Sequence, residues 1–215
     1  MDLLAATWQY IEANQARFQA AVVAHLQLSL GALLIAVLLF VPLGVLVSRG
    51  GPGASGVLAL VAGSRVVPSL AVLFLLLPFM GLGNGPALVA LVLLAGPPIV
   101  LNTDAGLKAV DPAVLEAARG MGLTPWQVFR TVRFPLALPV IVAGVRSASV
   151  EVIGSATLAA FIGAGGLGQF ITSGLTLLDP RMLLAGAIPV TLMALAAEGL
   201  FGLLERRLAP GRAAG

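Results

Sequence analysis

Residues 18–48 read FQAAVVAHLQLSLGALLIAVLLFVPLGVLVS and contain no Asp, Glu, Lys or Arg. A helix needs about 20 apolar residues to cross the hydrocarbon core of a bilayer. This charge-free stretch therefore predicts one transmembrane helix, at about 22–47. The run Arg49-Gly50-Gly51-Pro52-Gly53, which is rich in turn-forming residues, marks its end.

The whole chain has the same apolar character. Of its 215 residues, 59% are hydrophobic and 10% are charged, whereas a soluble domain has about 25% charged residues. So few charges exclude a soluble domain, and so much apolar content excludes disorder. The chain has no Cys, which excludes disulfides, thiolate metal sites and Cys nucleophiles. We predict an all-α polytopic membrane protein.

Charged and turn-forming residues divide the chain into about five transmembrane helices in a single domain, 22–207. The predicted spans are about 22–47, 57–79, 87–103, 136–162 and 182–204. Arg65 and Pro68 interrupt the second span. Residues 163–181 are rich in Gly, Ser and Thr, which predicts a loop. Residues 104–135 are too polar to lie in lipid.

Basic residues give the orientation, because Lys and Arg gather in cytoplasmic loops. Five spans place eight of them on one side: Arg49, Lys108, Arg119, Arg130, Arg133, Arg206, Arg207 and Arg212. Only Arg17 and Arg181 fall on the other side. We therefore expect the 104–135 loop and the tail, 208–215, in the cytoplasm.

Residues 1–21 are expected outside the cytoplasm as an interfacial amphipathic helix. Trp8, Tyr10 and Phe18 suit the headgroup region of a bilayer. A basic segment is absent from the first residues, so we expect no cleavable signal peptide.

The 104–135 loop carries two helix-start signals. Asp111-Pro112 predicts a capped helix that stops at Gly120-Met121-Gly122. Thr124-Pro125 predicts a second short helix, 126–132, that ends before Pro135. From the residues alone, this apolar pair is either a surface for a partner protein or a helix pair resting on lipid headgroups.

This loop resembles the coupling loop of ABC importer permeases. The family pattern is Glu-Ala-Ala, three residues, Gly, nine residues and Ile-x-Leu-Pro. Here the matching residues are Glu116, Ala117, Ala118, Gly122, Val132, Phe134 and Pro135, with Trp126 between them. Val132 replaces Ile and Phe134 replaces Leu.

The resemblance implies the fold of a type I ABC importer permease in a bacterial or archaeal cytoplasmic membrane. The loop would dock on ABC ATPase subunits, which would bind the ATP and Mg, so this chain itself would hold no cofactor and would not be an enzyme. A second permease copy or homologue would complete the pathway. A separate extracytoplasmic binding protein would deliver the solute, and nucleic acid is not a partner.

Further residues resemble the osmoprotectant permeases, whose importers carry glycine betaine, carnitine and choline. They are His25-Leu26, residues 67–71, Pro98-Ile99-Val100, Asn102-Thr103, residues 143–146 and residues 159–168. Methionine importer permeases share the layout and remain the alternative. Leu101 stands where the osmoprotectant family often has Arg, and Val66 where it often has Thr, which leaves the solute open.

Two charges, Arg65 and Glu151, fall inside predicted spans, where a charge costs about 2.5–3.5 kcal/mol on insertion scales. They are expected to face the bundle interior, either along the translocation pathway or as a structural ion pair. Pro68, Ser69, Asn102 and Thr103 are the other candidates for the pathway or for gating.

Gly163, Gly165, Gly166 and Gly168 match the dinucleotide-binding pattern G-x-G-x-x-G. That motif needs a preceding strand, and here a transmembrane helix precedes it. A flexible extracytoplasmic loop for gating or docking is the better interpretation.

His25 is the only histidine. We expect a hydrogen-bonded residue rather than a metal ligand, because no second ligand of the usual type is near in sequence. An intramembrane enzyme is a remote alternative, because no base lies near a candidate nucleophile such as Ser64 or Ser147. We therefore assign no catalytic and no metal-binding residues.

Overall fold

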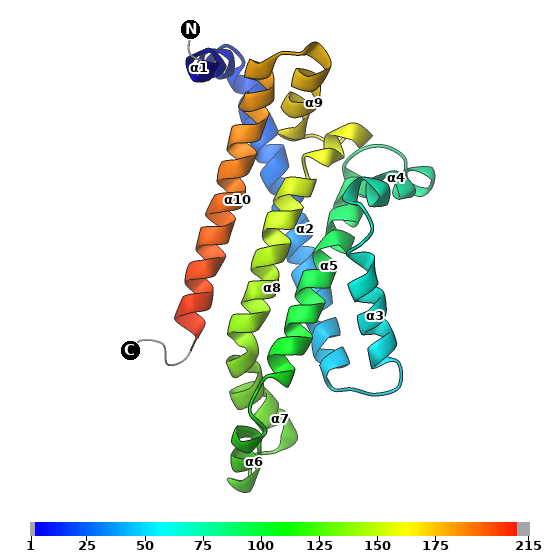
Figure 1. Ribbon diagram of the computed structural model, residues 1–215, viewed down its shortest axis with the longest axis vertical. Helices are drawn as coiled ribbons and strands as arrows, with labels where there is room; N and C mark the ends of the chain where they lie inside the picture. The colour runs from blue at the N-terminus through cyan, green and yellow to red at the C-terminus, as the bar shows by residue number, and fades with distance from the viewer. Residues whose placement is uncertain (1–2, 210–215) are drawn as a thin grey trace.

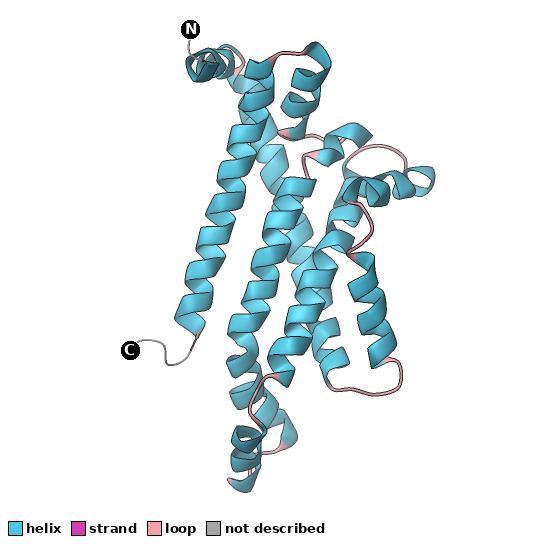
Figure 2. Ribbon diagram, in the orientation of Figure 1, coloured by secondary structure: helices cyan, strands magenta, loops and turns pink. Residues whose placement is uncertain are grey.

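The computed structural model describes residues 3–209 as a bundle of helices, without a β-strand in that range (Figures 1 and 2). The helices are α1 (Leu3–Ala13), α2 (Gln15–Ser48), α3 (Ala54–Ser64), α4 (Ser69–Met80), α5 (Asn84–Lys108), α6 (Pro112–Gly120), α7 (Pro125–Val128), α8 (Phe134–Ser155), α9 (Gly168–Leu177) and α10 (Pro180–Leu208). A π-helical turn, η1 (Phe129–Arg133), joins α7 to α8, and a 3₁₀ turn, η2 (Leu158–Ile162), follows α8.

Four helices of the described chain are long and apolar enough to cross a membrane. They are α2, α5, the continuous helix 125–155 and α10. Helices α3 and α4 together are a fifth candidate, either as one broken span or as a re-entrant loop, and they are bent by 103° at residues 65–68. The predicted fold class is confirmed, and the second predicted span is interrupted at Arg65 and Pro68, as expected.

Helix α5 packs against both α2 and α8 and supplies much of the core. Close approach depends on two glycines. A Cβ at Gly44 of α2 would lie 2.6 Å from the Thr103 Cβ, and one at Gly144 of α8 would lie 2.6 Å from the Asn102 Cβ. On both sides of α5, its side chains therefore pack directly against the backbone of the neighbouring helix.

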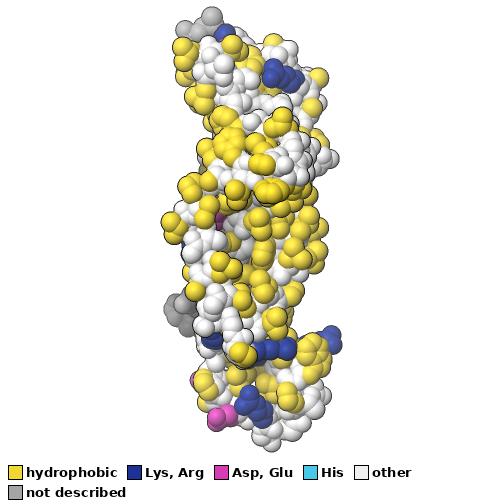
Figure 3. Space-filling view, turned by 90° about the vertical axis from the view of Figure 1, so that its right-hand side faces the viewer, with side chains coloured by type: hydrophobic (Ala, Val, Ile, Leu, Met, Phe, Trp, Pro, Cys, Tyr) yellow, Lys and Arg dark blue, Asp and Glu magenta, His cyan; other side chains and the backbone are white. Residues whose placement is uncertain are grey.

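Different helices form the two ends of the molecule. In Figure 1, α1 and α9 lie at the upper end, whereas α6, α7 and the turn after α2 lie at the lower end. Charged side chains gather toward the ends of the face in Figure 3, and its middle is largely apolar, as a bilayer requires. Arg212 and the rest of the predicted tail beyond residue 209 fall outside the described residues.

The prediction for residues 1–21 needs correction. Helix α1 ends at Ala13, and Gln15 already belongs to α2. Trp8 is 63% exposed, but Tyr10 and Phe18 pack edge-on against the buried ring of Phe170, with ring centroids 6.3 and 6.0 Å away. These two aromatics therefore pack α1 and α2 against α9.

The predicted loop 163–181 is also wrong in part, because it contains α9. Helix α8 ends at Ser155, short of the predicted 162, and η2 follows it. Asp179 caps α10 by accepting a hydrogen bond from the Arg181 backbone N–H at 3.0 Å. The Arg181 side chain also binds Asp179 and lowers the pKa of that carboxyl, so the cap stays charged at neutral pH.

Candidate functional site

The loop at the basic end is built as its cap signals predict. The Asp111 carboxylate accepts a hydrogen bond from the Ala113 N–H at 2.8 Å, which starts α6. Gly122 has φ +87°, a left-handed conformation that suits glycine after the helix end. Glu116 and Ala117 of α6 are exposed, whereas Ala118 is 2% exposed and faces the loop's own core. The Glu-Ala-Ala motif therefore presents its carboxylate outward.

The second short helix does not end where predicted. Thr124 and Gln127 form a capping box that starts α7, but the chain continues through η1 into α8 without a break. Pro135 lies in the first turn of α8, where a missing N–H is tolerated. Val132 and Pro135 thus lie on one helix with the residues of the membrane-spanning segment.

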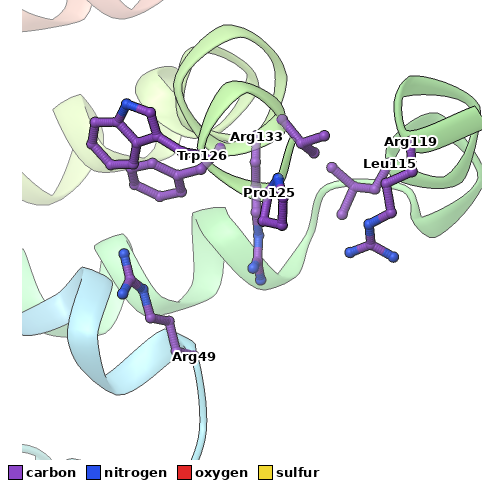
Figure 4. Close-up of a pocket in the computed structure, with 8 residues that line it drawn as sticks. Arg49, Leu115, Arg119, Pro125, Trp126 and Arg133 are labelled. Carbon is purple, nitrogen blue, oxygen red and sulfur yellow. The ribbon is translucent and has the colours of Figure 1, made fainter. Parts of the chain in front are cut away.

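An open cleft of about 370 Å³ separates α6 from the end of α2. Figure 4 shows Arg49 reaching toward the aromatic pair at Trp126, with Arg133 and Arg119 farther along the wall. Trp126 stacks on Phe129 with centroids 5.8 Å apart, and the Arg49 guanidinium lies 5.8 Å from the Phe129 centroid. The cleft is basic and aromatic.

The loop is tied to the ends of three long helices. Arg49 follows α2, and the Arg133 Nε donates to the Leu107 carbonyl of α5 at 3.0 Å. Leu107 also belongs to a small apolar cluster with Ala137 and Ile141 of α8. The loop is therefore in contact with the ends of α2, α5 and α8.

An ion cluster that the sequence did not reveal joins α8 to α10. Arg146 Nη1 lies 2.8 Å from the Glu205 Oε2, and Arg146 Nε lies 3.4 Å from the Glu198 Oε1. The cluster was not predicted from the sequence, because no local pattern connects Arg146 with residues more than 50 positions away. The cluster links α8 to the lower half of α10, where most apolar side chains are exposed.

We expect Arg146→Ala to loosen this half of α10. Because the three side chains are 31–49% exposed, the loss should be about 1 kcal/mol of unfolding free energy, or about 2–4 °C in Tm for a chain of this size. Thermal unfolding of the purified chain in detergent measures it. Arg206→Ala is the matched control, and equal shifts in the two variants would contradict a role for the cluster.

The candidate pathway residues do not all come together. Arg65 and Pro68 lie at the bend between α3 and α4, and Ser69 begins α4. Glu151 of α8 lines a cavity of about 380 Å³ beside that bend. Among the described residues no ion pair within 4.0 Å joins Arg65 to Glu151, so the structure does not show the direct pair that was one of the two alternatives.

Asn102 and Thr103 lie elsewhere, at the helix contacts described above. The Asn102 Nδ2 donates to the Pro98 carbonyl at 2.8 Å, and Thr103 is fully buried against Gly44 of α2. Their observed contacts are with helices packed around α5 and not with the cavity.

Part of the glycine-rich segment, which was expected to be a flexible loop, is packed against the bundle. Gly166 and Gly168 are buried, and the Gly165 N–H donates to the Asn84 Oδ1 at 3.3 Å. A Cβ on Gly166 would lie 3.2 Å from the His25 Nδ1. No β-strand precedes the segment within the described chain, so it lacks the setting of a dinucleotide site.

The predicted hydrogen bonding of His25 is confirmed. Its side chain is fully buried, and Nε2 lies 3.1 Å from the Ile153 carbonyl of α8. Because a carbonyl only accepts, Nε2 carries the proton. Residues 3–209 contain no group of three or more His, Asp or Glu side chains that could hold a metal ion.

Comparison with known proteins agrees with this geometry. The family described as "Binding-protein-dependent transport system inner membrane component" matches residues 40–210. The carnitine transport permease protein OpuCB of Listeria monocytogenes is 44% identical over 209 residues, which cover 97% of this chain and 89% of that protein. The glycine betaine/carnitine/choline transport system permease protein OpuCB of Bacillus subtilis is 42% identical over 186 residues, covering 86% of each.

A solved structure shares the fold. An inward-facing structure of the MetNI methionine ABC transporter superposes with a TM-score of 0.81 at 22% identity, and the match covers 92% of this chain and 98% of that one. At this identity the likeness concerns the helix arrangement alone.

Proposed function

The chain belongs to the family of binding-protein-dependent transport system inner membrane components, and we propose that it is the permease subunit of an ATP-driven importer of quaternary amines. The observation that carries the proposal is identity of 42–44% to carnitine and glycine betaine/carnitine/choline permeases along most of the chain. The match includes the loop with Glu116 and the helices that surround it.

The arrangement of the helices suggests where each partner protein would bind. Helices α6 and α7 project beyond the bundle at its basic end (Figure 1), which we assign to the cytoplasm. ABC ATPase subunits would dock there and would hold the ATP and Mg. A second copy or homologue would pack against the exposed apolar faces of the bundle, and a binding protein would deliver the solute at the opposite end.

Methionine is the second candidate solute, because the solved transporter with this fold carries it. At 22% identity that likeness speaks for the helix arrangement only, and the relatives at 42–44% identity are named for quaternary amines. The quaternary amines are therefore preferred.

The solute retained by the partner binding protein tests the proposal. We expect the binding protein that co-purifies with the tagged chain to retain labelled glycine betaine, choline or carnitine in equilibrium dialysis, and to release labelled methionine. Unlabelled glycine betaine should displace the bound label. Retention of methionine without any of the three amines would refute the proposed solute class.

A further inference from the structure

The cavity beside the α3–α4 bend combines apolar walls with a carboxylate. Its volume of about 380 Å³ falls in the range of about 300–1,000 Å³ that is typical of small-molecule pockets. Phe40 of α2, Val61 of α3, Val72 of α4 and Pro97 of α5 form part of the wall, and Glu151 of α8 completes it. Four spanning segments thus meet around one acidic group.

The charges at this cavity are not used by the fold. Within residues 3–209, neither Arg65 nor Glu151 has an ion-pair partner within 4.0 Å or a side-chain hydrogen bond. Arg65 lies between Ser64 and Val67, which both line the cavity. Unpaired charges inside a spanning region are costly, so they are expected to serve a ligand.

The aromatic wall is held in place by a glycine. A Cβ at Gly96 of α5 would lie 2.9–3.1 Å from three atoms of the Phe40 ring. Any side chain at position 96 would therefore displace the ring. The Phe40 ring thus packs directly against the α5 backbone at Gly96, and it lines the cavity together with Pro97.

We infer that this cavity is a subsite for the quaternary amine during its passage, with the ammonium group between Glu151 and the Phe40 ring. A quaternary ammonium is bulky and weakly hydrated, so apolar walls, an aromatic ring and one carboxylate suit it. In a zwitterion such as glycine betaine, the carboxylate would face Arg65. This inference rests on the proposed function and adds the residues that recognise the two ends of the cargo.

Substitution of Arg65 and substitution of Glu151 should affect the uptake of two cargoes differently. Choline has no carboxylate, whereas glycine betaine has one. At saturating loaded binding protein, Glu151→Gln should slow uptake of both cargoes about tenfold, because one charge contact is worth about that much at a partly exposed site. Arg65→Gln should slow glycine betaine uptake similarly and leave choline uptake unchanged or faster.

The experiment uses the complete transporter in liposomes, with labelled choline and labelled glycine betaine as probes. Phe40→Leu should slow both cargoes about two- to fivefold through loss of the cation–π contact, and Gly96→Ala should act in the same direction. The controls are Glu12→Gln on α1 and Gly199→Ala on α10, where an added Cβ meets nothing within 4 Å. Size-exclusion profiles identify variants that fail to assemble.

The outcomes separate this inference from the proposed function. Equal slowing of glycine betaine and choline uptake by Arg65→Gln would indicate a structural role for Arg65 and overturn the inference. Uptake that none of the four variants changes would overturn it as well. A wild-type transporter that takes up neither cargo would overturn the proposed function and this inference with it.

Discussion

Glu116→Lys is expected to abolish recovery of the ATPase subunits with the permease. Three acidic residues lie in the loop 104–135, and two are occupied within the chain. Asp104 pairs with Lys108 at 2.8 Å, and Asp111 caps α6. Glu116 is exposed and has no ion-pair partner among the described residues. It is therefore the carboxylate of this loop that is free to meet another protein.

The size of the effect follows from the surroundings. Removing one member of a desolvated interface charge pair costs about 2–5 kcal/mol, and the introduced lysine would also stand on a loop that carries Arg119, Arg130 and Arg133. We expect more than a hundredfold weaker association, since each 1.4 kcal/mol is a factor of about ten. Pull-down of the ATPase with the tagged permease, and ATPase activity of the recovered complex, measure it.

Two further variants serve as controls for Glu116→Lys. Glu116→Gln should weaken the complex less than Glu116→Lys, because it removes the charge without reversing it. Glu12→Lys on α1 makes the same change at the other end of the molecule and should leave ATPase recovery at the wild-type value. An unchanged yield with Glu116→Lys would show that the ATPase docks elsewhere.

The fold was predictable wherever a local pattern determines the structure. The charge-free run 18–48 lies within one helix, α2, and Asp111-Pro112 and Thr124-Pro125 start helices as their cap chemistry requires. The break near Arg65 and Pro68 was visible as a charge and a proline, but its angle of 103° was not. Such an angle depends on what α3 and α4 pack against.

Features that depend on distant parts of the chain were missed. Helix α9 was hidden because Gly168 and Gly174 were interpreted as loop residues, whereas they give close contact with Thr157 and Leu183. The helix continues from α7 into α8 past Pro135, and a π-helical turn, η1, joins the two parts. The contact of Arg146 with Glu205, like that of Phe40 with Gly96, joins residues more than 50 positions apart, and no periodicity encodes it.

Gly168→Ala is expected to prevent stable folding of the end that bears α9. A Cβ at this position would overlap the backbone carbonyl oxygen of Thr157 and lie 2.8 Å from the Thr157 Cα. Backbone atoms cannot rotate away as a flexible side chain can, so α9 would have to move as a unit. Because α9 carries Phe170, the ring that holds Tyr10 and Phe18, the displacement would also loosen α1.

We expect the Gly168→Ala substitution to cost about 3 kcal/mol or more, at the upper end for overpacking. Thermal unfolding in detergent and the yield of monodisperse protein measure it. Gly154→Ala is the matched control, because its Cβ would meet nothing within 4 Å and alanine favours a helix. It should keep or slightly raise the Tm. Equal stability of the two variants would mean that residues 163–168 are a movable loop, the interpretation first drawn from the sequence, and that the packing of Gly168 against Thr157 contributes little to the fold.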